Sequence, residues 1–460
     1  MKRISYERFE ALAAYARAPI TRLYAEEVGW FEHANERVLG LLIRDRTDND
    51  FGGVILAHDK KLRYRCAHAT AFDPSVHRAR IALRREMERA AAESGESYHQ
   101  GDEQGEAIDF FSPLASTDAL NPHFVRLRDL EQYSAARGII EPMMRWYEDV
   151  DGNFVEQFQT AGFDPRIWEL YLFAAFHEMG FAIDRTYPAP DFRCFGPFGS
   201  FCVEATTVNP SRDASGAIVP EPPLTTPDDM EAYLRHYMPI KFGSALYSKL
   251  QKKYWDKTHV GSQPFIIALQ DFSAPQSMTR TRSAFESYVF GYAHDWDRDE
   301  KGNLRIHPRK IEKHTWGSKE IPSGFFDQPD TENISAVIFS NSGTISKFNR
   351  MGVLAGFGSP RLRLIRTGFA VDHDPNASAS RAFRKLVNDP GYSEIWSEGM
   401  SVWHNPKARY PLEADMLPYA AHHHLLPDGQ IESLTPDWHP FGSITLQALV
   451  DNDSASGVGK

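Results

Sequence analysis

Three acidic residues in one short region of the chain have types and positions that indicate chemistry. Glu169 lies in a segment that is apolar almost throughout, Asp191 follows a proline, and Glu204 stands between two apolar residues. Burying an ionised carboxylate costs several kcal/mol unless a charge, a metal ion or several hydrogen bonds compensate for it. Glu169 therefore needs a partner, and Asp191 and Glu204 follow it closely in the chain.

The three acids are expected on one helix and two neighbouring strands. Residues 167–179 predict a buried helix that begins after a proline and ends before a glycine. Glu169 shares a helix face with apolar residues at the i+3, i+4 and i+7 positions. Residues 192–195 and 201–208 predict two strands of a hairpin. Because successive side chains of a strand point to opposite faces, Glu204 is expected on the other face from Val203 and Ala205.

This order of a helix Glu, a Pro-Asp pair before a strand and a strand Glu resembles the core of the PD-(D/E)XK nuclease superfamily over residues 167–207. The resemblance implies a restriction-endonuclease-like core that hydrolyses phosphodiester bonds in DNA or RNA. It implies that Asp191 and Glu204 hold Mg²⁺ or Mn²⁺ together with the main-chain carbonyl of Ala205, and that Glu169 is the helix acid. Hard oxygen ligands of this kind suit these ions, which can activate a water molecule for attack on phosphorus.

One position departs from the family pattern, because Thr206 stands where the superfamily has a lysine. That lysine stabilises charge on the attacking water or in the transition state. Residues 242–254 predict a helix that follows in the chain, on which Lys249 and Lys253 are four residues apart and share a face. We expect one of these two lysines to supply the missing cation, with Lys252 as a further candidate.

A purely structural interpretation of each acid stands beside the catalytic one. Glu169 lies near a helix N-terminus, where the macrodipole favours an acid, and Asp191 belongs to a Pro-Asp pair of a kind frequent in turns. Glu204 fits this interpretation less well, because acids are depleted from strands. The alternative function is a nuclease-like scaffold that lost its chemistry at Thr206 and serves as a binding or assembly component.

The formal net charge of −11 argues against a protein that grips nucleic acid over its whole surface. Positive charge is concentrated in two segments, residues 241–257 and 347–366. These basic patches are candidate contacts for a nucleic acid backbone. Charge runs of this kind also occur as solvated faces without a ligand.

The chain of 460 residues is long for one domain and predicts two or three. We expect an N-terminal α+β module over residues 1–105 and a nuclease-like αβ core over residues 120–295. A β-rich C-terminal region is expected over residues 296–450, with a disordered tail at 451–460, so that the fold class is α+β overall with a mixed sheet flanked by helices. The adjacent histidines 422–424 are expected in a solvent-exposed loop.

The sequence contains no run of about 18 apolar residues that would span a membrane. The first residues lead into no apolar segment of the kind found in a secretory signal. A cytoplasmic protein without a membrane partner is therefore expected. The cysteines Cys66, Cys194 and Cys202 are too few and too scattered for a zinc site or a disulfide framework, so reduced thiols are expected.

Overall fold

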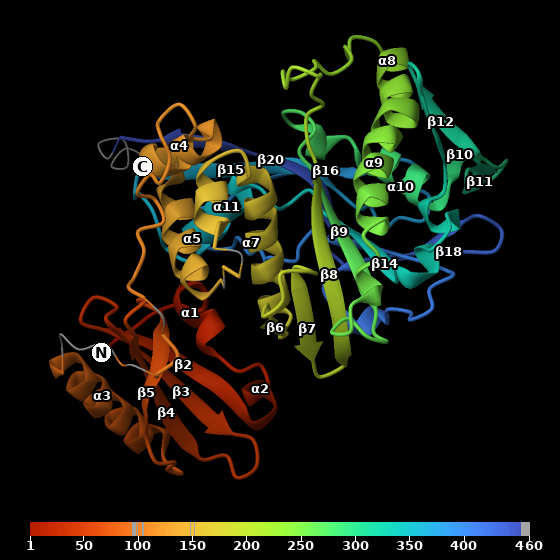
Figure 1. The fold of residues 1–460 in the computed structure, drawn as a ribbon. Coiled ribbons are helices and arrows are strands. Elements are labelled where there is room, and N and C mark those ends of the chain that lie inside the picture. The colour runs from red at the N-terminus through yellow and green to blue at the C-terminus, as the bar shows by residue number, and fades with distance from the viewer. Residues whose placement is uncertain (94–97, 99, 104, 148, 151, 452–460) are drawn as a thin grey trace, which may run out of the picture.

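The computed structural model describes residues 1–93, 98, 100–103, 105–147, 149–150 and 152–451. Helices and strands are mixed along the chain, and the expected α+β class is confirmed (Figure 1). No helix within these ranges is long and apolar enough to cross a membrane. Apart from Asp451, the expected C-terminal tail lies outside the described residues.

The N-terminal part of the chain folds as an antiparallel sheet with one long helix on it. Its five strands follow one another across the sheet in chain order. Helix α3 (Val76–Ala92) packs Leu83 and Met87 on this sheet. Gly53 makes close approach possible, since a Cβ at this position would lie 2.9 Å from the Leu83 side chain. The strands are β1 (Lys2–Arg3), β2 (Ala25–His33), β3 (Val38–Asp45), β4 (Phe51–His58) and β5 (Tyr64–Ala69), and helices α1 (Tyr6–Ala13) and α2 (Thr21–Tyr24) lie between β1 and β2.

The largest sheet has eight strands in the order β19-β18-β17-β14-β9-β8-β7-β6. Three neighbours, β8, β9 and β14, run parallel (Figure 1). All residues of β9 and β14 are buried, as expected for parallel strands that are covered on both faces. The strand bounds are β6 (Ala182–Asp184), β7 (Phe192–Gly196), β8 (Gly199–Val208), β9 (Phe265–Asp271), β14 (Ala336–Phe339), β17 (Ser401–His404), β18 (Ala421–Leu425) and β19 (Ile431–Leu434).

Helices cover both faces of this sheet and form two separate apolar layers. On one face, Val203 of β8 packs with helices α5, α7 and α11. On the other face, Cys202 of the same strand packs with α9 and α10. The strand alternation therefore assigns successive residues of β8 to different cores. The helix bounds are α4 (Pro122–Asp129), α5 (Ser134–Trp146), α6 (Phe154–Gln159), α7 (Phe163–Glu178), α8 (Pro227–Ala232), α9 (Met238–Leu250), α10 (Arg282–Phe290) and α11 (Ile345–Leu354).

The expected core boundary at residue 295 is wrong, because the eight-stranded sheet continues beyond it. β14 pairs with β9, and β17, β18 and β19 extend the sheet to residue 434. The buried histidines His422 and His423 lie on β18, so the expected exposed loop at 422–424 is also wrong. The boundary error arises because a sequence pattern can mark a strand but does not say which sheet it joins, and the histidine error arises because three polar residues in a row do not signal a buried strand.

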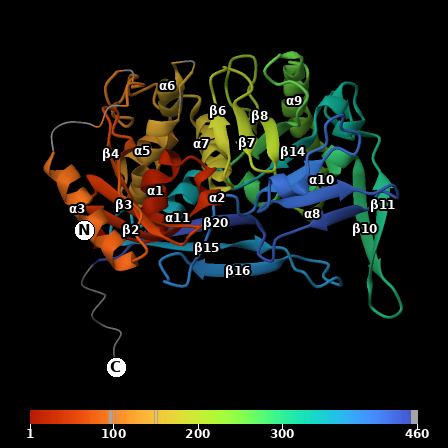
Figure 2. The same cartoon turned by 90° about the horizontal axis from the view of Figure 1, so that it is seen from below.

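The remaining C-terminal strands form smaller sheets beside this core. One of them has three strands, with β15 between β16 and β20, and is seen at the bottom of Figure 2. Two hairpins complete the region. The bounds are β10 (Tyr292–Arg298), β11 (Leu304–Lys310), β12 (Lys313–Trp316), β13 (Lys319–Pro322), β15 (Leu362–Ala370), β16 (Arg381–Leu386) and β20 (Pro440–Leu449).

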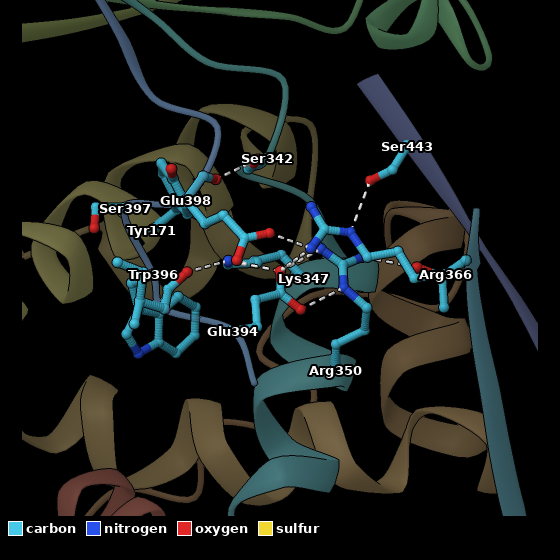
Figure 3. A network of polar contacts seen from close by, with 12 residues as sticks. Tyr171, Ser342, Lys347, Arg350, Arg366, Glu394, Trp396, Ser397, Glu398 and Ser443 are labelled. Atoms are coloured by element: carbon cyan, nitrogen blue, oxygen red, sulfur yellow. Dashed lines mark hydrogen bonds and ion pairs between the residues drawn. The ribbon is translucent and has the colours of Figure 1, made fainter. Parts of the chain in front are cut away.

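A buried network of five charged side chains joins α11 to β15 and to the loop before β17 (Figure 3). Glu394 is at its centre. Its carboxylate accepts hydrogen bonds from Lys347 at 2.7 Å and from two nitrogens of Arg350 at 2.8 Å, while Arg366 lies 3.3 Å away and also bonds Glu398. Burial alone would raise the pKa of the Glu394 carboxyl, but the three cations hold that pKa well below its ordinary range.

This network shows that the basic patch expected at residues 347–366 is wrong as a nucleic acid surface. Lys347, Arg350 and Arg366 are buried, and their charges are directed at carboxylates inside the protein. Arg361 pairs with Glu131 at 3.3 Å. The sequence shows that this segment contains several cations, but it does not show that they pair with carboxylates that are distant in the chain.

We expect Glu394→Gln to lower the free energy of unfolding by about 3–5 kcal/mol, because it leaves three buried cations short of their central anion. Urea unfolding at pH 7 measures the loss. Glu320→Gln is the matched control, since Glu320 and its partner Lys313 are more than half exposed and their pair contributes little. Equal stability of Glu394→Gln and the parent protein would contradict a stabilising role for the network.

Candidate active site

Asp191 and Glu204 lie close together beside the start of β7. The antiparallel pairing of β7 with β8 begins at Phe192 and Val203, and Asp191 and Glu204 are the neighbours of these two residues. Asp191 Oδ2 also accepts a hydrogen bond from the Ala205 amide at 2.7 Å. The fold therefore brings these three expected site residues together.

Glu204 faces α9 and meets a lysine there. Its Oε1 accepts hydrogen bonds from Lys249 Nζ and from the Tyr254 hydroxyl, each at 2.6 Å. Burial and the Glu204 carboxylate raise the pKa of the Tyr254 hydroxyl, which therefore remains a donor at neutral pH. Glu204 is 5 % exposed, and its other oxygen, Oε2, is buried and accepts no hydrogen bond within the described part of the chain.

Asp191 is a partly buried acid with two other carboxylates nearby. Burial raises the pKa of its carboxyl well above the ordinary value, and the nearby carboxylates of Glu204 and Glu169 raise it further, while Lys249 lowers it. A cavity of about 20 Å³ adjoins Asp191, with Arg166 among its lining residues. A space of this size holds about one water molecule.

Glu169 lies on α7 and already has the partner that its burial demands. Both of its carboxylate oxygens accept hydrogen bonds from Arg166 Nη1 at 2.9 Å, and Oε2 also accepts one from the Tyr147 hydroxyl. The Arg166 guanidinium stands one helix turn before Glu169, in an i,i+3 pair. Glu169 therefore influences Asp191 through its charge, while its own oxygens are engaged in a separate ion pair.

Lys253 does not reach the acids, which corrects the expectation that it shares a helix face with Lys249. Helix α9 ends at Leu250, and Lys253 adopts a left-handed backbone conformation with φ of 47°. Its ammonium pairs with Asp330 at 2.9 Å on the surface. The helix terminates because the chain turns sharply here, so the four-residue spacing no longer places both lysines on one side.

Two carboxylates and one carbonyl are the candidate ligands of a metal ion. The unpaired Oε2 of Glu204 is an oxygen that a cation would compensate. In a strand the N–H and C=O of one residue point to the same side, so the Ala205 carbonyl is also on the side of Asp191. These hard oxygens fit Mg²⁺ or Mn²⁺. Among the described residues, no group of three His, Cys, Asp or Glu side chains is arranged to hold a metal.

Four residues of this region were not identified as site residues from the sequence: Tyr147, Arg166, Arg185 and Tyr254. Arg185 donates to the Asp191 carbonyl at 3.2 Å and lies 3.5 Å from the centre of the Tyr147 ring. The i,i+3 spacing of Arg166 and Glu169 is a signal that the sequence does contain. No spacing rule connects Glu204 with Tyr254, which lies beyond the end of α9.

We expect Asp191→Asn to raise the stability of the metal-free protein at pH 7 by about 1–3 kcal/mol, because the amide carries no charge that is desolvated and repelled by Glu204 and Glu169. The raised pKa of Asp191 means that its carboxylate costs stability once the pH exceeds about 3.9, the value for an unfolded chain. The advantage of the variant should therefore shrink as the pH falls toward 4. Urea unfolding in EDTA across this range measures it.

Asp297→Asn is the control for this measurement, because its effect should have the opposite sign. The hydrogen bond from Arg305 lowers the pKa of the exposed Asp297, so this carboxylate favours folding at neutral pH. If Asp191→Asn also lost stability at pH 7, the ionised Asp191 carboxylate would be a stabilising group.

We expect Arg166→Ala to lower the free energy of unfolding by about 3 kcal/mol, because Glu169 then keeps a buried charge without a cation. Arg166→Ala with Glu169→Gln should recover part of the loss, and chemical denaturation of the single and double variants measures the coupling. Arg305→Ala removes an exposed ion pair and should lose little. Additive losses in the double variant would contradict a direct pairing of Arg166 with Glu169.

Comparisons with known proteins identify no relative of this chain. No family model matches it, and neither a curated protein nor a solved structure is significantly similar. The candidate site is therefore defined by its own geometry: Asp191 close to Glu204 and bonded by the Ala205 amide, a lysine from α9 on Glu204, and a separate ion pair at Glu169.

Proposed function

We propose that this protein is a divalent-metal-dependent nuclease that hydrolyses phosphodiester bonds in DNA or RNA. The observation that carries the proposal is the contact between Lys249 and Glu204. In the PD-(D/E)XK pattern a lysine two residues after the strand Glu stands beside the acids, and here that position is Thr206. A lysine from α9 occupies the corresponding chemical role, because its ammonium lies 2.6 Å from the same carboxylate.

The proposed roles of the residues follow from their contacts. Asp191, Glu204 and the Ala205 carbonyl would hold Mg²⁺ or Mn²⁺, which would activate water and neutralise charge on the phosphate. Lys249 supplies a positive charge to the attacking group or the transition state. Tyr254 fixes Glu204 by donating to Oε1, which leaves Oε2 available.

Access to Asp191 sets a condition on this proposal. The adjoining cavity accommodates about one water molecule, and Tyr187 and Pro188 form part of its wall. The Tyr187 ring stacks on His259 with centroids 3.9 Å apart, and His259 contacts the Ala189 carbonyl at 2.8 Å. A phosphodiester can therefore reach Asp191 from this side only when the segment that contains Tyr187 moves.

The alternative function is a nuclease-like scaffold without activity, which binds or assembles with other molecules. The closed wall beside Asp191 favours it, and so do the charges of residues 241–257. In that segment Lys241 pairs with Glu221, while Lys249 and Lys253 are also paired with carboxylates. Few surface cations of the segment remain to contact a nucleic acid backbone.

Incubation of the purified protein with single- and double-stranded DNA and RNA in Mg²⁺ or Mn²⁺ tests the proposal. We expect cleavage that EDTA abolishes, and a loss of at least about a hundredfold in rate for Asp191→Asn and Glu204→Gln, because each removes charge at the metal. Lys249→Met should lose activity on the same scale. Gel electrophoresis of labelled substrates follows the reaction.

Lys253→Met is the matched control, since Lys253 lies four residues from Lys249 but pairs with Asp330. Its rate should equal that of the parent protein. Cleavage that persists in Asp191→Asn and Glu204→Gln would overturn the assignment of the site. An absence of cleavage on all four substrates would favour the scaffold.

A further inference from the structure

A second and much larger cavity lies at the carboxyl ends of the three parallel strands. Its volume is about 730 Å³, within the range of small-molecule sites. Segments that follow each of β8, β9 and β14 line it, at residues 218–221, 272–276 and 344–346 respectively. Helices α4 and α7 close another side with Arg126 and Phe163.

The topology explains why a cavity forms here. The chain leaves β9 toward α10 on one face of the sheet, and it leaves the neighbouring β14 toward α11 on the other face. Connections that diverge from adjacent parallel strands open a crevice between them, and such crevices are the usual ligand sites of open α/β sheets. The cavity is therefore built into the strand order and needs no distortion of the backbone.

Two arginines line this cavity, in a protein whose net charge is −11. Arg126 and Arg280 line it, and neither guanidinium has an ion pair with a described carboxylate; Arg280 Nε is buried without a hydrogen-bond acceptor. The lining also contains two acids, Asp164 and Glu221. Glu221 is paired with Lys241 at 3.4 Å, and burial raises the pKa of Asp164.

The start of α11 adds further donors at the same place. Thr344, Ile345 and Ser346 line the cavity, the Thr344 side chain caps no amide, and the first turn contains no acidic residue. The first amides of a helix have no partner within the helix, and with the macrodipole they attract anions. The lining of this one cavity therefore offers both guanidinium groups and helix amides, and both are donors that suit a phosphate.

The remaining lining suits a flat apolar group. Phe163, Phe272 and Tyr133 supply aromatic rings, and Ile167 and Ile345 supply aliphatic surface. A phosphate alone would leave most of this cavity unfilled, whereas an attached aromatic ring would bury the apolar wall. The size of the cavity, its two arginines and its apolar wall thus favour a ligand that is anionic at one end and aromatic at the other.

We propose that this cavity binds a nucleotide, with its phosphate between Arg126, Arg280 and the N-terminus of α11 and its base against the aromatic wall. This site is separate from the acids at Asp191 and Glu204, and it does not depend on nuclease activity. It gives the chain a ligand-binding function at the edge of the sheet where β8, β9 and β14 end.

Isothermal titration calorimetry of the full-length protein with AMP, adenosine and inorganic phosphate tests the proposal. We expect AMP to bind, with adenosine and phosphate each at least about tenfold weaker, because each lacks one half of the recognised group. Arg280→Gln and Arg126→Gln should each weaken AMP binding by about tenfold or more, since each removes a charge-assisted hydrogen bond. Arg126 is exposed at the rim, so its variant should fold even if Arg280→Gln does not.

Arg305→Gln is the matched control, because it makes the same change on a surface hairpin outside the cavity. It should bind AMP as the parent does. Failure of the parent protein to bind AMP would overturn the proposal, and so would unchanged affinity in both cavity variants. Equal binding of phosphate and AMP would overturn the nucleotide assignment. The titration involves no hydrolysis, so it remains decisive even if the nuclease proposal fails.

Discussion

The parallel pairing of β8, β9 and β14 is the constraint on which the other features of this molecule depend. Parallel neighbours require a crossover along a face of the sheet, and α9 and α10 lie in these crossovers. Together with α7 on the opposite face, they remove β8 from water, which forces the carboxylate of Glu204 into the interior. The same pairing aligns three carboxyl ends at one edge. The acidic site and the nucleotide-sized cavity are therefore two consequences of one arrangement.

This protein contains two kinds of buried carboxylate cluster, which differ in the number of nearby cations. Around Glu394, three cations surround the carboxylates, and the pKa of Glu394 is lowered. Around Asp191, acids outnumber the nearby lysine, the pKa is raised, and one oxygen of Glu204 lacks a donor. The first arrangement is electrostatically complete and joins elements to one another. The second leaves one carboxylate oxygen without a donor, an arrangement that a bound cation would complete.

Local patterns predicted the elements of the acidic site well. The apolar helix at 167–179 and the strand at 201–208 correspond to α7 (Phe163–Glu178) and β8 (Gly199–Val208), since periodicity and terminators are local signals. Long-range partners could not be predicted in this way. The cations of residues 347–366 meet carboxylates encoded elsewhere, and Lys253 is lost to the site because its helix stops three residues earlier.

The network around Glu394 also limits how this sequence can evolve. Loss of any one of its charges leaves the others buried and unbalanced, and a charge-neutral interior would require several substitutions at once. Positions 347, 350, 366, 394 and 398 should therefore change together among homologues, as a set that is either wholly ionic or wholly apolar. Because these residues come from α11, β15 and the loop before β17, the three segments should coevolve.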